Sequence, residues 1–240
     1  MSEDALLNVR GLTKSFGSVE VIRGMDISFS LGKRHLIIGP NGAGKTTFFN
    51  LLNGQIPSSS GTIEFLGHDI TRLSVRQRAL LGLGRTFQIA SLFQELSVWE
   101  NVMIAAGAPA SPLRHESALK SIAEEALDTC GLRARRDERV RTLSYGEQRR
   151  LEIALSLTTE PKLLLLDEPM AGLTRSEREM LAERIAKLSR TTSVLMIEHD
   201  LEIGLPLAEH LTVLHLGQVV ASGHRDDVMR DPFVRKIYLV

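Results

Sequence analysis

One stretch of this 240-residue chain has the residue types and spacing of a phosphate-binding loop. Residues 39–46 read Gly-Pro-Asn-Gly-Ala-Gly-Lys-Thr and fit G-x-x-x-x-G-K-[ST] at every fixed position. Glycine permits positive φ angles, which bring successive backbone N–H groups close to an anion. In this pattern Lys45 reaches the terminal phosphates and the Thr46 hydroxyl binds Mg²⁺. The loop therefore predicts a nucleoside triphosphate site with Mg²⁺ as cofactor.

The pattern is meaningful only where a strand enters the loop and a helix leaves it. Residues 36–38 are Leu-Ile-Ile, a short apolar run typical of a buried strand. Residues 46–53 read as a helix that stops at Gly54. The helix start adds the positive end of its dipole to the site. An ordinary glycine-rich turn is the alternative, and these flanks disfavour it.

Acidic and basic side chains follow two further apolar runs. Asp167 and Glu168 come directly after the continuous run 163–166, which is typical of a central parallel strand. Asp167 is expected to hold Mg²⁺ and Glu168 to polarise an attacking water; the alternative is a pair of solvated turn acids. His199 likewise follows the apolar run 193–197. It is expected to contact the γ-phosphate; the alternative is an ordinary hydrogen-bonded surface residue.

Composition limits the class of protein. Lys plus Arg and Asp plus Glu are 29 each, so no global field favours nucleic acid as a partner. The apolar runs are too short to span a bilayer, and the acidic N-terminus lacks an export signal. Cys130 has no internal cysteine to pair with, which agrees with a reducing cytoplasm.

The remaining pattern predicts an α/β fold around the loop. Short strands are expected at 7–9, 19–22, 25–29 and 62–67, as an antiparallel layer against the parallel core. Helices are expected from 98, behind the N-cap Ser97 with Glu100 as its capping-box partner, and over 119–130, 144–157 and 176–188. A hairpin through Gly217 closes the sheet. We expect one domain, with core and β layer in 1–87 and 160–240 and a helical subdomain in about 88–159.

A second anion-binding helix start is predicted in residues 143–148, Leu-Ser-Tyr-Gly-Glu-Gln. Arg149, Arg150 and Glu152 on this helix are expected to point outward. One chain needs only one triphosphate cradle, so a second one suggests a site shared between two copies. This stretch resembles the LSGGQ signature of ABC-type ATPases. The resemblance covers nearly the whole chain, because the other landmarks of that family follow in order.

The resemblance assigns a role to each landmark. It implies ATP contacts from an adenine-stacking aromatic, the loop, a Q-loop glutamine and a switch histidine: Phe16, Gly39, Pro40, Asn41, Gly42, Ala43, Gly44, Lys45, Thr46, Thr47, Gln88 and His199. It implies metal binding by Thr46, Gln88 and Asp167, and catalysis by Glu168, His199 and Lys45. It also implies that Ser144, Tyr145, Gly146 and Glu147 contact ATP held by the other chain.

By the same resemblance, the fold is a RecA-like P-loop ATPase core with an antiparallel β layer and a helical subdomain. The chain is expected to hydrolyse ATP in a head-to-tail homo- or heterodimer with a second ATPase subunit. It would drive transmembrane permease subunits, and through them a periplasmic binding protein, from the cytoplasmic face of the inner membrane. The apolar stretch around Phe93 and Trp99 is expected to contact the permeases or, alternatively, to pack within its own lobe.

Three positions depart from the family pattern. Tyr145 and Glu147 replace the usual Gly and Gln of the signature, and Thr174 stands where the D-loop has aspartate. A carboxylate at Glu147 is expected to repel phosphate unless it is directed elsewhere, and Thr174 is expected to alter communication between the two sites. Lys45, Asp167, Glu168 and His199 are intact, so turnover remains expected.

The detailed sequence is similar to the ATPase subunits of hydrophobic amino acid uptake systems, which include branched-chain amino acid, urea and short-amide importers. The similarity lies in residues 143–157, in Ala171-Gly172-Leu173 and in residues 197–202. The alternatives are a lipopolysaccharide-type exporter ATPase, a soluble ABC protein without a transport role, and a nucleotide-binding module without turnover.

Overall fold

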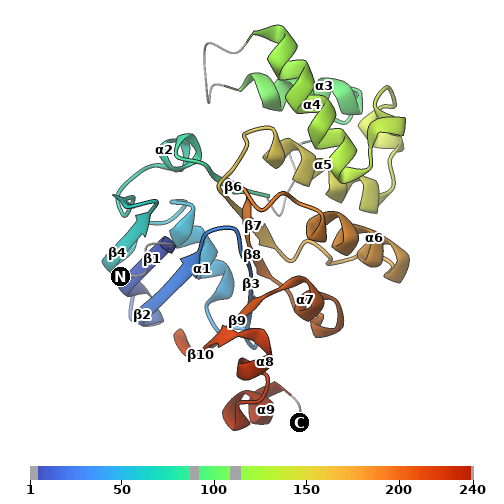
Figure 1. The fold of residues 1–240 in the computed structure, drawn as a ribbon. Coiled ribbons are helices and arrows are strands. Elements are labelled where there is room, and N and C mark those ends of the chain that lie inside the picture. Colours follow the sequence, from blue (N-terminus) through green and yellow to red (C-terminus); the bar gives the residue numbers. More distant parts are fainter. Residues whose placement is uncertain (1–4, 87–91, 109–114, 239–240) are drawn as a thin grey trace.

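A six-stranded, mostly parallel sheet forms the centre of the computed structural model, which describes residues 5–86, 92–108 and 115–238 (Figure 1). Its strand order is β10-β9-β3-β8-β7-β6. The strands are β3 (Arg34–Ile38), β6 (Leu83–Arg85), β7 (Leu163–Asp167), β8 (Ser193–Ile197), β9 (His210–His215) and β10 (Gln218–His224). β3, β6, β7, β8 and β9 pair in parallel, and β10 is antiparallel to β9. The predicted parallel core and closing hairpin are confirmed.

The alternation of side chains along the central strands builds two apolar layers. Leu164 and Leu166 of β7 belong to the cluster that contains α5 and α6, whereas Leu163 and Leu165 belong to the cluster that contains α1 (Lys45–Leu52). Because successive side chains of a strand face opposite sides, Asp167 belongs to the α1 face. The strand thus directs its last side chain toward the helix that follows the predicted phosphate loop.

An antiparallel sheet packs on the α1 side, as predicted, with the order β2-β1-β4-β5. Its strands are β1 (Ala5–Phe16), β2 (Val19–Ser30), β4 (Ser60–Phe65) and β5 (His68–Asp69). The prediction of several short strands before residue 30 was wrong, because β1 and β2 each run for 12 residues. Gly11 and Gly24 have positive φ, and the β1–β2 register shifts between Val9 and Leu12; the glycines therefore bend a ladder that continues through them.

Three helices gather at one end of the molecule, away from the antiparallel sheet (Figure 1): α3 (Val98–Gly107), α4 (Glu116–Cys130) and α5 (Tyr145–Leu157). The Ser97–Glu100 capping box predicted for α3 is present. Two 3₁₀ turns, Arg133–Arg135 and Val140–Thr142, lead into α5. The remaining helices are α6 (Arg175–Ala186), α8 (Arg225–Val228), α9 (Pro232–Tyr238) and two that the sequence did not predict, α2 (Val75–Leu80) and α7 (Leu201–Leu207).

The charged side chains of α5 do not all face solvent, so this expectation was wrong. Arg149 and Glu152 form an ion pair of 2.8 Å, and their side chains are only 12% and 11% exposed. Arg150 donates hydrogen bonds to the carbonyls of Cys130 and Gly131, at the end of α4. The last carbonyl groups of a helix have no partner within the helix, and arginine side chains can bind them. Arg150 therefore connects α5 to the C-terminal end of α4.

Within the ranges described, no helix is both long and apolar enough to cross a membrane.

The fold contains one buried histidine that predicts an acid-sensitive stability. His35 of β3 accepts a hydrogen bond from the Ser30 N–H, stacks on His210 with centroids 4.9 Å apart, and lies near Lys33 and Glu209. Burial, with the neighbouring His210, lowers the pKa of His35 to about 4. The unfolded chain therefore binds the proton more tightly, and stability falls as pH drops from about 6.5 to about 4.

We predict that this histidine alone contributes about 3 kcal/mol to the pH dependence of unfolding across that window. Urea unfolding of the wild type and of His35→Gln at pH 7.5, 6 and 4.5 checks it. The gap between the two free energies of unfolding should narrow as the pH falls. Parallel curves for the two proteins would contradict the assignment.

Candidate nucleotide site

The phosphate-loop candidate, residues 39–46, lies between β3 and α1 as its pattern requires. Gly42 and Gly44 have φ of 80° and 97°, which glycine adopts without steric cost. Gly39 tolerates no side chain, because a Cβ there would lie 2.5 Å from the carbonyl oxygen of Leu214 in β9. The loop is closed by Ala43, whose N–H donates to the Pro40 carbonyl at 3.1 Å. Packing therefore fixes the loop against the sheet.

Lys45 is the first residue of α1 and is buried within this loop. Its Nζ donates to the carbonyls of Gly39 and Pro40 at 2.6 and 3.2 Å. Burial lowers its pKa, and the nearby carboxylates of Glu168 and Asp167 act in the opposite direction. Thr46, the next residue, is exposed. The structure thus brings the predicted cation close to both predicted acids.

Asp167, the last residue of β7, has a fully buried side chain. Its Oδ2 accepts from Arg85 Nη2 at 3.1 Å, and its Oδ1 is buried with no hydrogen-bond partner among the residues described. Burial raises the pKa of Asp167, and Arg85 and Lys45 oppose that rise. A buried, unpartnered carboxylate oxygen at the α1 face fits a hard divalent cation such as Mg²⁺. Thr46, the predicted second oxygen donor, lies in the first turn of α1.

Glu168 and His199 face each other at the ends of neighbouring strands. His199 Nε2 lies 3.0 Å from Glu168 Oε1, and both side chains are partly exposed. Glu168 has a φ of 48°, which is strained for a residue with a side chain, and its N–H donates to the Ile197 carbonyl at 3.0 Å. This hydrogen bond across to β8 holds the strained residue next to the strand that supplies His199.

Two charged residues at this edge, Glu198 and Arg85, were missed from the sequence. Glu198 accepts from the Met170 N–H at 2.9 Å and so fixes the turn after Glu168; burial raises its pKa to about 7. The available signals were an acid directly after the apolar run 193–197 and an arginine directly after the uncharged stretch 79–84.

Ser144 is the N-cap of α5, and it forms a capping box with Glu147. Glu147 Oε2 accepts from the Ser144 N–H at 2.8 Å, and its Oε1 accepts from Arg135 at 3.1 Å. The Glu147 carboxylate is thus directed into a helix cap and an ion pair, which offsets the expected repulsion of phosphate. Thr174 similarly caps α6 in a capping box with Glu177, whose Oε1 lies 3.5 Å from Ser144 Oγ.

Tyr145 is half exposed, and a Cβ on Gly172 would lie 3.1 Å from its ring. The signature candidate therefore packs against the loop that follows Glu168.

Phe16, the expected adenine-stacking residue, is the last residue of β1. Half of its surface is exposed, and Lys14 Nζ lies 4.9 Å from its ring centroid. Gln88 lies outside the described residues.

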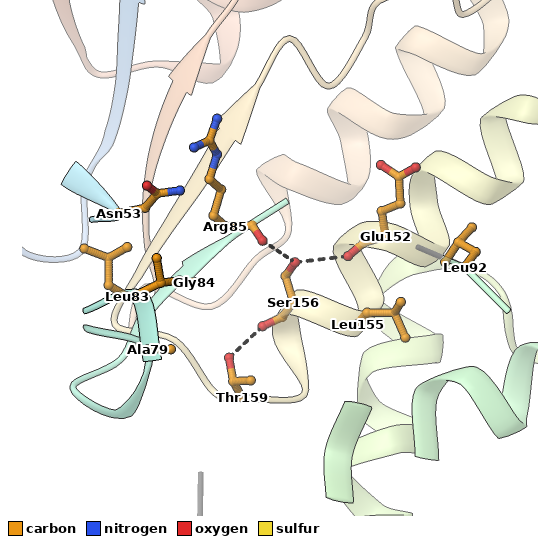
Figure 2. A pocket seen from close by; sticks show the side chains of 11 residues that line it. Asn53, Ala79, Leu83, Gly84, Arg85, Leu92, Glu152, Leu155, Ser156 and Thr159 are labelled. Atoms are coloured by element: carbon orange, nitrogen blue, oxygen red, sulfur yellow. Dashed lines mark hydrogen bonds between the residues drawn. The ribbon is translucent and has the colours of Figure 1, made fainter. Parts of the chain in front are cut away.

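An apolar pocket of about 350 Å³ lies next to Arg85, between α2, β6 and α5 (Figure 2). Its apolar lining residues are Val75, Ala79, Leu83, Leu92 and Leu155. In Figure 2 the Arg85 carbonyl faces the Ser156 hydroxyl, which donates to it at 3.3 Å, while the guanidinium extends away from Ser156.

The apolar stretch that was expected to contact permeases or to pack within its own lobe is partly buried. Leu92 and Val98 are buried, the Trp99 ring packs against the Arg136 guanidinium, and Phe93 is 53% exposed.

This fold, with a phosphate loop and acids at the ends of adjacent parallel strands, defines a P-loop nucleotide-binding protein. The ABC transporter family model matches residues 22–171, and the chain belongs to that family, whose members bind and hydrolyse ATP.

Known proteins resemble the chain along almost its whole length. The high-affinity branched-chain amino acid transport ATP-binding protein BraF of Pseudomonas aeruginosa is 36% identical over 248 residues, covering 98% of this chain and 97% of that protein. The lipopolysaccharide export system ATP-binding protein LptB of Acidithiobacillus ferridurans is 35% identical over 241 residues, covering 100% and 98%. A crystal structure of an ABC transporter cassette in its ADP conformation superimposes with a TM-score of 0.88 at 31% identity, covering 98% of each chain. The predicted P-loop ATPase fold is confirmed.

The packing of Gly39 leads to a prediction. In Gly39→Ala the new Cβ would force the loop away from Leu214, an overpacking that costs about 1–3 kcal/mol. We expect a lower Tm and an ADP affinity at least about tenfold weaker, measured by isothermal titration calorimetry. The control is Gly107→Ala, where a Cβ meets nothing within 4 Å. Unchanged ADP affinity in Gly39→Ala would contradict the assigned loop.

Proposed function

We propose that the chain is the ATP-hydrolysing motor subunit of an importer for branched-chain amino acids or related amides. The observation that carries this proposal is the 36% identity to the Pseudomonas aeruginosa branched-chain amino acid transport ATP-binding protein over 98% of the chain. An importer motor would work as a peripheral subunit at the cytoplasmic face of the membrane, together with permease subunits.

In the proposed site, residues 39–47 cradle the phosphates of ATP and Phe16 stacks on the adenine. Lys45, now hydrogen-bonded to loop carbonyls, turns to the terminal phosphates. Thr46, Gln88 and Asp167 would hold Mg²⁺, which when bound neutralises phosphate charge. The unpartnered Oδ1 of Asp167 supports this assignment.

Hydrolysis is assigned to the Glu168–His199 pair. Glu168 lies close enough to Lys45 of the phosphate loop to act on its pKa, so its carboxylate can orient and polarise a water for attack on the γ-phosphate. His199, 3.0 Å from Oε1 of Glu168, would contact the same phosphate and hold the carboxylate in place. The pair therefore combines positioning with proton acceptance.

The signature segment at the start of α5 would complete the site of a second ATPase subunit. Ser144 and Gly146 lie at a capped helix N-terminus, where N–H groups and the helix dipole favour an anion. Tyr145 and Glu147 flank it, and the latter is withdrawn into the cap. Each ATP would lie between the phosphate loop of one chain and this helix start of the other, in a two-fold arrangement.

The apolar pocket beside Arg85 is the proposed contact surface for a permease subunit. It lies between the core strand β6 and helices α2 and α5, with the exposed ring of Phe93 next in sequence to its lining residue Leu92. An exposed apolar surface of this kind is typical of a protein interface. A movement of α5 relative to the core would then transmit conformational changes at the ATP site to the permease.

Lipopolysaccharide export is a second candidate function, because the export ATPase of Acidithiobacillus ferridurans is 35% identical over the full chain. Deleting the gene in its host and measuring uptake of labelled leucine, isoleucine and valine separates the two. Import predicts a loss of uptake that the wild-type gene restores and Glu168→Gln does not. Normal uptake with lipopolysaccharide retained in the inner membrane would overturn the importer assignment in favour of export.

The catalytic assignment gives a prediction for the purified protein. Glu168→Gln keeps the size of the side chain but removes the carboxylate, so ATPase activity should fall by about 100-fold or more while ADP affinity stays unchanged. Phosphate release and calorimetry measure the two quantities. Glu179→Gln, an exposed acid on α6, is the control and should keep full activity. Wild-type turnover in Glu168→Gln would refute the role of this carboxylate.

A further inference from the structure

Arg85 makes a set of contacts that the proposed ATPase roles do not use. It is the last residue of β6, and its side chain is only 7% exposed. Nη1 donates to Asn50 Oδ1 at 2.6 Å and to Gln55 Oε1 at 2.9 Å, and Nη2 donates to Asp167 Oδ2 at 3.1 Å. Within the described residues, the buried Nε has no partner. The guanidinium therefore joins the helix after the phosphate loop to the end of β7.

The strand register explains why this arginine reaches Asp167. β6 and β7 are parallel, with Arg85 opposite Leu165, so Asp167 lies two residues further along β7 on the same face. The planar fork of arginine can bind a carboxylate oxygen and the two amide oxygens at once, which the single ammonium of lysine does less well. The geometry thus favours arginine at this position.

The ion pair leaves the two oxygens of Asp167 in different states. Oδ2 is held by Arg85, whereas Oδ1 is buried and without a hydrogen-bond partner among the described residues. A carboxylate fixed at one oxygen cannot rotate freely, so the other oxygen keeps one direction. Outer contacts of this kind commonly orient metal ligands, and their removal costs about 10–100-fold in metal affinity.

We propose that Arg85 is a positioning residue that orients the Asp167 carboxylate for the divalent cation of the nucleotide site. The inference rests on the proposed function, because it assigns the cation to Asp167. The carbonyl of the same residue accepts from Ser156 of α5 at the wall of the apolar pocket. The metal-binding carboxylate is thereby connected to the helix whose first turn carries the signature segment.

The test is direct binding of Mn²⁺ to the full chain in the presence of saturating ADP, measured by electron paramagnetic resonance of free Mn²⁺. Arg85→Gln is expected to weaken Mn²⁺ binding about 10–100-fold, and Arg85→Lys by less. ADP affinity in EDTA should be unchanged in both variants. The matched control is Arg149→Gln, which breaks an ion pair of similar burial on α5 and should leave Mn²⁺ binding at the wild-type level.

Wild-type Mn²⁺ affinity in Arg85→Gln would overturn the inference, and so would an equal loss of ADP affinity in EDTA. Absence of ADP binding in the wild type would instead refute the proposed function. If Arg85→Gln fails to fold, the double variant Arg85→Gln/Asp167→Asn decides. Removing both charges should restore a folded protein with a cooperative thermal unfolding transition, since the carboxylate left unpaired is the cause of the loss. A double variant that also fails to fold contradicts a role through Asp167.

Discussion

Burial of the Asp167 carboxylate at the end of a central strand is the constraint on which the site depends. A charge in that position is costly unless it is paired, and Arg85 supplies the pair from the neighbouring strand. The same guanidinium binds Asn50 and Gln55, so the strand edge and the P-loop helix are held in one arrangement. Lys45 and Glu168 then lie close to a carboxylate that is already bound at one oxygen.

In the proposed dimer, the second half of the site would depend on helix caps rather than on a buried ion pair. Ser144 and Thr174 each start a helix with a capping box, and the carboxylate of Glu177 reaches both starts. The Glu147 carboxylate accepts hydrogen bonds from the Ser144 N–H at the cap of α5 and from Arg135. The two residues that depart from the family pattern, Glu147 and Thr174, therefore each take part in a capping box that starts a helix.

The sequence was most informative where a residue type in a given pattern has a single structural explanation. The glycines of residues 39–44, the apolar strand before Asp167 and the capping box at Ser97 all predicted what the structure contains. It failed where tertiary contacts decide. Short strands were expected to end before Gly11 and on either side of Gly24, but both glycines form bends within long strands, because partner strands continue the ladder. Arg149 and Arg150 were expected to point outward and Arg85 was missed, because only packing supplies the carboxylates and carbonyls that bind these arginines.

A crystal structure of Glu168→Gln with Mg²⁺ and ATP tests the central claim most directly. The account predicts phosphates over residues 39–46 and a Mg²⁺ ion about 2.0–2.1 Å from the Thr46 hydroxyl, on the side of Asp167 Oδ1, with Oδ2 still bound to Arg85. Phosphates bound elsewhere, or a metal ion remote from both Thr46 and Asp167, would contradict it.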